Sequence, residues 1–401
     1  MIAASALALF LGAGAFTSET AAQTAAGQAA LRARAYDFVY NLDYDEAIAA
    51  FREAVAADPD DAAGWRGLAA TAWIQTLFGR GSILVDDYLG VLSRAEVAKP
   101  PPPPDLSRAF RESVERALAI AEPRRQLRPG DAAACYDVGA ALALSVSWTA
   151  TVDGKVLAAV RSAKRAFSEH ERALELDPSR HDAALVAGAY RYTVSQLSAP
   201  LRWLSWLGGF PGGKRRGIQL IEQAAANPSD VQADAQFALV VVYNREGRPR
   251  DALEMIDRLR ARFPRNRLLW LEYGASAIRA GLGVDAEREL SQGLVRFAGD
   301  TRPRAPGEEA RWHLALGSAR LLLGRADAAM ADLRAALALG PRDWILGRIH
   351  IELGKAADLG GDRASASTAY QAAIFYCERD GDSAGATEAR RLLARPSSRS
   401  R

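Results

Sequence analysis

Small and bulky apolar residues recur along most of the chain at the spacing of an α-helix. In several segments a small residue is followed four positions later by a bulky one, and three positions after that by another small one. Because an α-helix turns every 3.6 residues, this spacing places all three on one face. The pattern predicts helices that approach closely through small residues while the bulky residue fills the space between them. It occurs at Ala47-Phe51-Ala54, Ala166-His170-Ala173, Gly217-Ile221-Ala224, Ala329-Leu333-Ala336 and Ala366-Tyr370-Ala373, and more loosely at Ala252-Ile256-Leu259 and Ala286-Leu290-Gly293.

A second pattern lies next to these segments and predicts a partner helix for each. It consists of large apolar residues followed by small ones, at Trp65-Leu68-Ala69, Leu239-Tyr243-Gly247, Trp270-Tyr273-Gly274, Leu316-Gly317-Gly324 and Leu353-Gly354-Gly361. A proline follows five residues after the last small position of the first pattern at Pro59, Pro178, Pro264 and Pro341. Since proline cannot continue a helix, these positions are predicted helix ends.

Together the two patterns resemble the tetratricopeptide repeat, whose signature is Trp-x2-Leu-Gly-x2-Tyr, then Ala-x3-Phe, then Pro. Ala252 and Ala286 are 34 residues apart, which is the usual length of this repeat, whereas the next two intervals are 43 and 37 residues. The resemblance covers roughly residues 28 to 395. It implies an all-α, right-handed solenoid of seven to eight helix pairs, whose first helices line a concave face. We expect the polar helix Ala384–Ala394 to cap the stack.

The regularity of the pattern changes along the chain and predicts its organisation. We expect a signal-like leader at 1–26, an irregular N-terminal array at 28–230 with insertions at 79–105 and 197–216, a regular C-terminal array with its capping helix at 231–395, and a disordered tail at 396–401.

The stretch from Ile2 to Phe16 is apolar or small throughout, and no Lys or Arg precedes Arg32. Its length is typical of a secretory signal core and short of the roughly 20 residues that span a bilayer. We therefore expect export to a periplasmic or envelope location. An uncleaved anchor, a misplaced start and a frayed Ala-rich helix are the alternatives, and the last two leave the protein in the cytoplasm.

The first insertion runs from the helix with Trp65 and Trp73 through GRGSILVDDYLG to the five prolines of Pro100–Pro104. Such a run is stiff and extended. We interpret it as a rigid connector, with a ligand for a proline-reading domain as the alternative.

The second insertion carries five large apolar side chains from Trp203 to Phe210, beside the basic Lys214-Arg215-Arg216. Trp203, Trp206 and Phe210 are the residues expected to contact a partner or a membrane surface, because aromatic residues next to basic ones suit a membrane interface. Packing within the protein is the favoured alternative. The segment is also similar to one in the Iml2/TPR39 group of tetratricopeptide proteins, which implies a non-enzymatic helical-repeat protein. The residues that carry this similarity are Pro200, Leu204, Leu207, Gly208, Gly213, Gly217 and Leu220.

Composition and motifs argue against several activities. The net charge is +3, from 51 basic and 48 acidic residues, so a nucleic-acid partner is a poor fit. We find no phosphate-binding loop, no nucleophile elbow and no pair of histidines at helical zinc spacing, and we expect no catalytic residue, no cofactor and no metal. We expect His170 to fill a core position and Cys135 and Cys377 to be buried, unreactive thiols.

The predicted concave face of the C-terminal array is enriched in basic residues among Leu and Ile. We expect it to bind an extended partner segment with apolar and acidic residues, since arginine pairs well with carboxylates. The predicted contact residues are Asn244, Arg245, Arg279, Arg311, Arg348 and Lys355. The full Lys/Asn set of a carboxylate clamp is absent.

The sequence therefore predicts a non-catalytic scaffold that binds a protein or peptide in the bacterial envelope or periplasm. The alternative is a membrane-surface accessory protein that docks through Trp203–Phe210. An enzyme built on helical repeats would need a pocket with clustered titratable groups, for which the sequence gives no sign.

Overall fold

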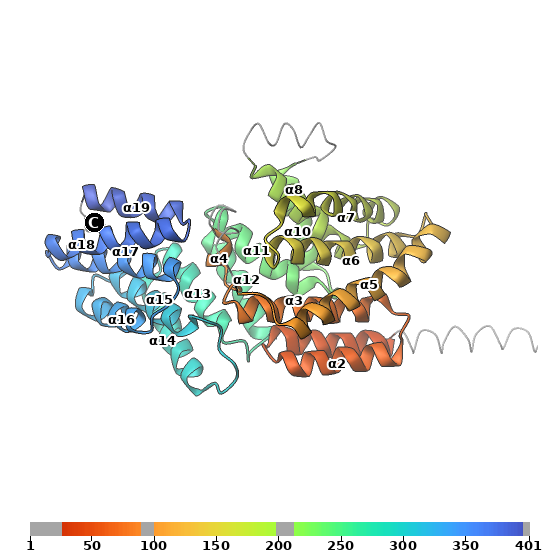
Figure 1. The fold of residues 1–401 in the computed structure, drawn as a ribbon, viewed down its shortest axis with the longest axis horizontal. Helices are drawn as coiled ribbons and strands as arrows, with labels where there is room; N and C mark the ends of the chain where they lie inside the picture. The colour runs from red at the N-terminus through yellow and green to blue at the C-terminus, as the bar shows by residue number, and fades with distance from the viewer. Residues whose placement is uncertain (1–25, 90–99, 198–211, 396–401) are drawn as a thin grey trace, which may run out of the picture.

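The structure is a computed structural model that describes residues 26–89, 100–197 and 212–395, and every regular element in these ranges is an α-helix. The leader, the segment Trp203–Phe210 and the tail lie outside these ranges. The helices stack as consecutive antiparallel pairs (Figure 1). The pairs are 26–40 with α2 (Tyr44–Ala57), α3 (Ala62–Gly79) with α5 (Pro104–Leu127), α6 (Ala132–Thr151) with α7 (Val156–Leu176), α8 (His181–Ser195) with α10 (Lys214–Ala226), α11 (Gln232–Arg245) with α12 (Pro249–Arg262), α13 (Leu268–Arg279) with α14 (Gly283–Gly299), α15 (Glu308–Leu322) with α16 (Ala326–Ala338), and α17 (Asp343–Leu359) with α18 (Arg363–Arg379).

The last helix, α19 (Ser383–Ala394), packs on α18 and ends the stack, as expected of a cap. One further turn of helix, α4 (Asp86–Leu89), belongs to the insertion between α3 and α5. The predicted all-α solenoid of paired helices is confirmed. None of the helices within the described ranges is long and apolar enough to cross a membrane.

The small–bulky–small pattern marks the contact between the two helices of a pair. Leu290 and Tyr370, two of its bulky residues, are fully buried. A Cβ added to Gly274 would come within 2.3 Å of Leu290, and one added to Gly354 within 2.3 Å of Tyr370. The first helix of each of these pairs thus lies against the bulky residue of the second, at a distance that only glycine permits.

The proline run differs from the predicted connector at one end. Pro103 is the N-cap of α5 and Pro104 is its first residue, so the last prolines of the run begin a helix. Proline fits the first turn because the N–H it lacks would have no intrahelical partner there. The helix continues to Leu127, with Pro123 inside it.

The array curves until its first pair meets the fifth pair and the loop between the fifth and the sixth. Tyr40, at the end of helix 26–40, lies 5.8 Å from the ring of Phe237 and 5.0 Å from that of Phe263. Its carbonyl accepts a hydrogen bond of 2.8 Å from the side-chain amide of Asn266, 226 residues later. The first turn of the solenoid is therefore closed by direct contact.

Five charged residues, here called the closure network, hold this contact. Arg302 donates to Asp43 and to Asp300 at 2.7 Å each. Arg267 donates to Asp300 at 2.9 Å and to Glu308 at 2.7 Å and 3.0 Å. The side chains of Arg267 and Glu308 are only 2% and 1% exposed. Burial alone would raise the pKa of Asp300, but hydrogen bonds from Arg302 and Arg267 outweigh it and hold that pKa well below its usual range.

Replacing Arg267 by Leu should destabilise the protein by about 3–5 kcal/mol, because it leaves the buried carboxylate of Glu308 without its partner. Thermal melts followed by circular dichroism measure the effect. Arg172→Leu is the matched control, since its ion pair with Glu175 is 47% and 65% exposed and such pairs contribute about 0–1 kcal/mol. Equal melting temperatures for the two variants would contradict the role of the closure network.

Candidate partner-binding groove

Three of the predicted contact residues come from the first helices of three successive pairs. Arg245 ends α11, Arg279 ends α13 and Arg311 lies in the first turn of α15. Arg245 and Arg279 occupy equivalent positions 34 residues apart, at the ends of their helices, whereas Arg311 lies at the opposite end of its helix, so the three reach the same groove from different helix ends.

All three arginines contact one stretch of the first insertion, residues 81–89, here called the groove segment. Arg311 holds both carboxylate oxygens of Asp87, at 2.8 Å and 3.1 Å, and also donates to the carbonyl of Gly81 at 2.8 Å. Arg279 forms an ion pair with Asp86. Arg245 donates to the backbone carbonyl of Tyr88. Figure 1 shows α4, which is part of this segment, beside α11 where the two halves of the array meet.

Two further residues that bind the groove segment were missed from the sequence. Arg342, which precedes α17, donates to the carbonyl of Gly81 at 3.0 Å. Glu272 on α13 accepts the backbone N–H of Val85 at 2.7 Å and is only 7% exposed. The repeat pattern did not mark Arg342, because this residue lies just before the first residue of α17. No local pattern distinguishes Glu272.

Burial, and after it the negative charge of Asp86, raises the pKa of Glu272 to about 8. Its carboxyl group is therefore protonated at neutral pH. In that form it offers an oxygen to the N–H of Val85 without adding a third negative charge beside Asp86 and Asp87.

The other predicted contact residues have different surroundings. Asn244 is buried and donates a hydrogen bond of 3.0 Å to the hydroxyl of Ser276. It also accepts a hydrogen bond of 3.2 Å from Arg279, so it orients that arginine. Arg348 pairs with Asp382 at 2.8 Å and Lys355 pairs with Glu352 and with Glu388, both at 2.8 Å. The ion-pair partners of Arg348 and Lys355 thus lie in α17 and at the cap helix rather than in the groove segment. Trp203, Trp206 and Phe210 lie outside the described residues, and their contact with a membrane or partner stays a prediction.

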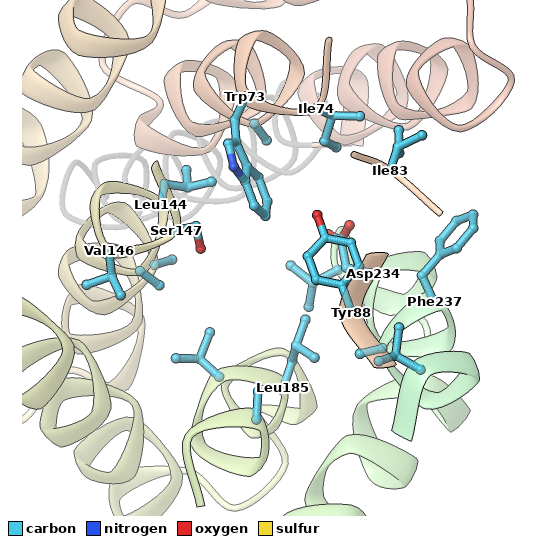
Figure 2. A pocket seen from close by; sticks show the side chains of 18 of the residues that line it. Trp73, Ile74, Ile83, Tyr88, Leu144, Val146, Ser147, Leu185, Asp234 and Phe237 are labelled. Carbon is cyan, nitrogen blue, oxygen red and sulfur yellow. The ribbon is translucent and has the colours of Figure 1, made fainter. Parts of the chain in front are cut away.

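A cavity of about 770 Å³ occupies the inside of the closed first turn. Its lining is mostly apolar and comes from α3, α6, α8 and α11; Figure 2 shows Trp73, Leu144, Leu185 and Phe237 directed into it. Four residues of the groove segment complete the wall on one side: Ile83, Leu84, Val85 and Tyr88. The groove segment thus lies between the cavity and the arginine groove and contacts both.

The remaining candidate groups are buried in the core as expected. The Nδ1 atom of His170 lies 2.7 Å from the carbonyl oxygen of Ala166, and burial lowers the pKa of this histidine to about 4. Cys135 and Cys377 are buried free thiols, and burial raises the pKa of Cys377 to about 12. Across the described part of the chain, no group of three His, Cys, Asp or Glu residues is placed to hold a metal ion.

Glu272 predicts a pH dependence of stability. Its folded pKa of about 8 lies above its ordinary value of 4.5, so the folded state keeps a proton that the unfolded state loses, and stability falls as pH rises through that range. Between pH 7 and 9 the wild type should lose on the order of 1 kcal/mol more than Glu272→Gln. In that variant an amide oxygen still faces Val85, Asp86, Asp87 and Arg279. Thermal melts at both pH values give the comparison, and parallel losses in the two proteins would contradict the assignment.

Comparison with known proteins supports the fold. Models of the tetratricopeptide repeat match residues 233–276, which run from α11 through α13, and residues 43–61, which include α2. No curated protein matches the sequence. The similarity of residues 200–220 to the Iml2/TPR39 group is not tested by these matches.

Solved structures are similar at low sequence identity. The APC/C hetero-tetramer Cut9–Hcn1 matches with 15% identity and a TM-score of 0.48 over 88% of this chain, which spans only 52% of that chain. A tetratricopeptide repeat protein from Parabacteroides merdae matches with 12% identity and a TM-score of 0.33 over 81% of this chain and 98% of its own. The human IFIT1 dimer with m7Gppp-AAAA matches with 15% identity and a TM-score of 0.42, over 92% of this chain and 87% of its own. The two family matches show that this chain contains tetratricopeptide repeats, and the repeat pattern and the paired helices agree with them.

Proposed function

We propose that the chain is a non-catalytic scaffold that binds a partner protein in the groove lined by Arg245, Arg279, Arg311 and Arg342. Tetratricopeptide repeats generally mediate protein–protein interaction, and the family is generally non-catalytic. The observation that carries the proposal is that these four arginines already hold a piece of polypeptide, through its carboxylates and its backbone carbonyls.

The chemistry of these contacts favours a protein partner. Arg311 binds a carboxylate and a backbone carbonyl at the same time, which a peptide with acidic side chains offers. Arg279 and Glu272 lie about two helical turns apart on α13, so carboxylate and amide recognition occur side by side. A groove of this kind reads the main chain and the charge of an extended segment together.

The same proposal places the protein in the bacterial envelope or periplasm. It is supported by the apolar stretch from Ile2 to Phe16, whose length is typical of a signal core. Cell fractionation with an antibody against the folded array should recover the protein from the periplasmic or envelope fraction. Recovery from the cytoplasm alone would contradict this part of the proposal.

Reversing the charge of the groove should abolish capture of the partner. In the triple variant Arg245→Glu, Arg279→Glu and Arg311→Glu, partner carboxylates meet repulsion instead of ion pairs, and captured protein should fall at least tenfold, as roughly 1.4 kcal/mol of lost binding already implies. In-cell crosslinking followed by mass spectrometry measures the captured protein.

A second triple variant provides the matched control for this experiment. Arg52, Arg258 and Arg334 are exposed and lie on the second helices α2, α12 and α16, so their replacement by Glu changes the net charge equally without touching the groove. The control should capture as much partner as the wild type. Equal capture by all three proteins would contradict the proposed function.

A further inference from the structure

We propose that the groove segment is a built-in substitute for the partner, which occupies the groove in the free protein and is displaced when the partner binds. The partner segment is then one in which aliphatic residues precede two adjacent carboxylates. This inference rests on the proposed function of the groove. It adds the chemistry of the partner segment and a way in which the protein itself limits partner binding.

The groove segment is held as a ligand is held. It belongs to none of the helix pairs, because it lies in the insertion between α3 and α5. Besides hydrogen bonds within itself and to the end of α3, it makes polar contacts with Arg245, Glu272, Arg279 and Arg311, which come from three different repeats, and with Arg342 at the start of the next. These residues lie 157 to 261 positions away in the sequence. A segment packed only as part of its own repeat would lack these distant contacts.

The two faces of the groove segment define what a partner must offer. Leu84 and Val85 are 6% exposed and, with Ile83, form part of the wall of the apolar cavity. Asp86 and Asp87 then face Arg279 and Arg311. A competing segment needs aliphatic side chains for the cavity side and two consecutive acidic residues for the arginines.

The groove segment leaves part of the groove unsatisfied. The Nε atom of Arg311 is buried and has no hydrogen-bond partner among the described residues, although the residue is only 6% exposed. The ion pair of Asp86 with Arg279 is 47% and 24% exposed, and exposed pairs of this kind contribute little. A partner that completes these contacts can replace the groove segment, which has the advantage of being tethered.

The covalent attachment of the groove segment to α3 makes it harder for a partner to displace. The groove segment follows directly on Arg80, the C-cap of α3, so its local concentration at the groove is high in addition to the contacts it makes there. Any external segment must compete with it, and the apparent affinity of that external segment is its intrinsic affinity multiplied by the fraction of molecules in which the groove is free. Releasing the groove segment should therefore increase the affinity for an external peptide of the same chemistry.

A fluorescein-labelled peptide with the sequence of residues 81–89, GSILVDDYL, tests this directly by fluorescence anisotropy against the full chain. Asp86→Asn with Asp87→Asn in the protein removes both carboxylates from the groove segment and keeps its shape. This variant should bind the peptide at least tenfold more tightly than the wild type does. Adding Arg311→Glu to it should abolish binding, as should the same two Asn replacements in the peptide.

Asp45→Asn with Asp327→Asn is the matched control, because both residues are exposed, lie outside the groove and change the charge equally. It should bind the peptide as weakly as the wild type. A second release variant, in which residues 82–89 are replaced by Gly-Ser repeats of equal length, applies if circular dichroism shows that the first has lost helix.

Two results would overturn the inference: equal affinity for the wild type and the release variants, or no binding to any of them. Neither depends on capture of a cellular partner. A failed capture with tight peptide binding to the release variant would refute the scaffold function and leave the self-occupied groove intact. Capture of a cellular partner without peptide binding would refute the self-occupied groove and leave the scaffold function intact.

Discussion

The closure network is the interaction on which the rest of the structure depends. Asp43 comes from the turn after the first helix, whereas Arg267, Asp300, Arg302 and Glu308 come from the sixth pair and the start of the seventh. By joining these distant repeats the network fixes the curvature of the array. The apolar cavity lies inside this curve for that reason, and the end of α3 is brought next to the C-terminal groove.

The groove segment is the direct consequence of that geometry. Gly81 has a φ of +58°, and a Cβ at this position would lie 2.5 Å from the carbonyl oxygen of Pro306, which sits between Asp300 and Glu308 in sequence. The chain can therefore leave α3 and enter the groove only with glycine at this point. Closure, the turn at Gly81 and occupation of the groove form one continuous arrangement.

The sequence predicted what is periodic and missed what is not. The helix pairs, their small contact positions and the placing of three groove arginines on first helices follow from spacing, because neighbouring repeats meet through local geometry. Asp86 and Asp87 pair with Arg279 and Arg311 at separations of 193 and 224 residues, which only the curvature of the whole array determines. Arg348 also lies on a first helix, α17, but Asp382, at the start of α19, engages it instead. The basic character expected of the groove is likewise offset by two carboxylates of its own chain.

Amide hydrogen exchange of Val85 is the measurement that tests this account most directly, because its N–H reports whether the groove segment is seated against Glu272. If the segment occupies the groove in the free protein, this amide should exchange at least about 100-fold more slowly than in an unstructured peptide, and addition of excess GSILVDDYL peptide should accelerate it. Exchange at the rate of an unstructured peptide in the free protein would contradict the account.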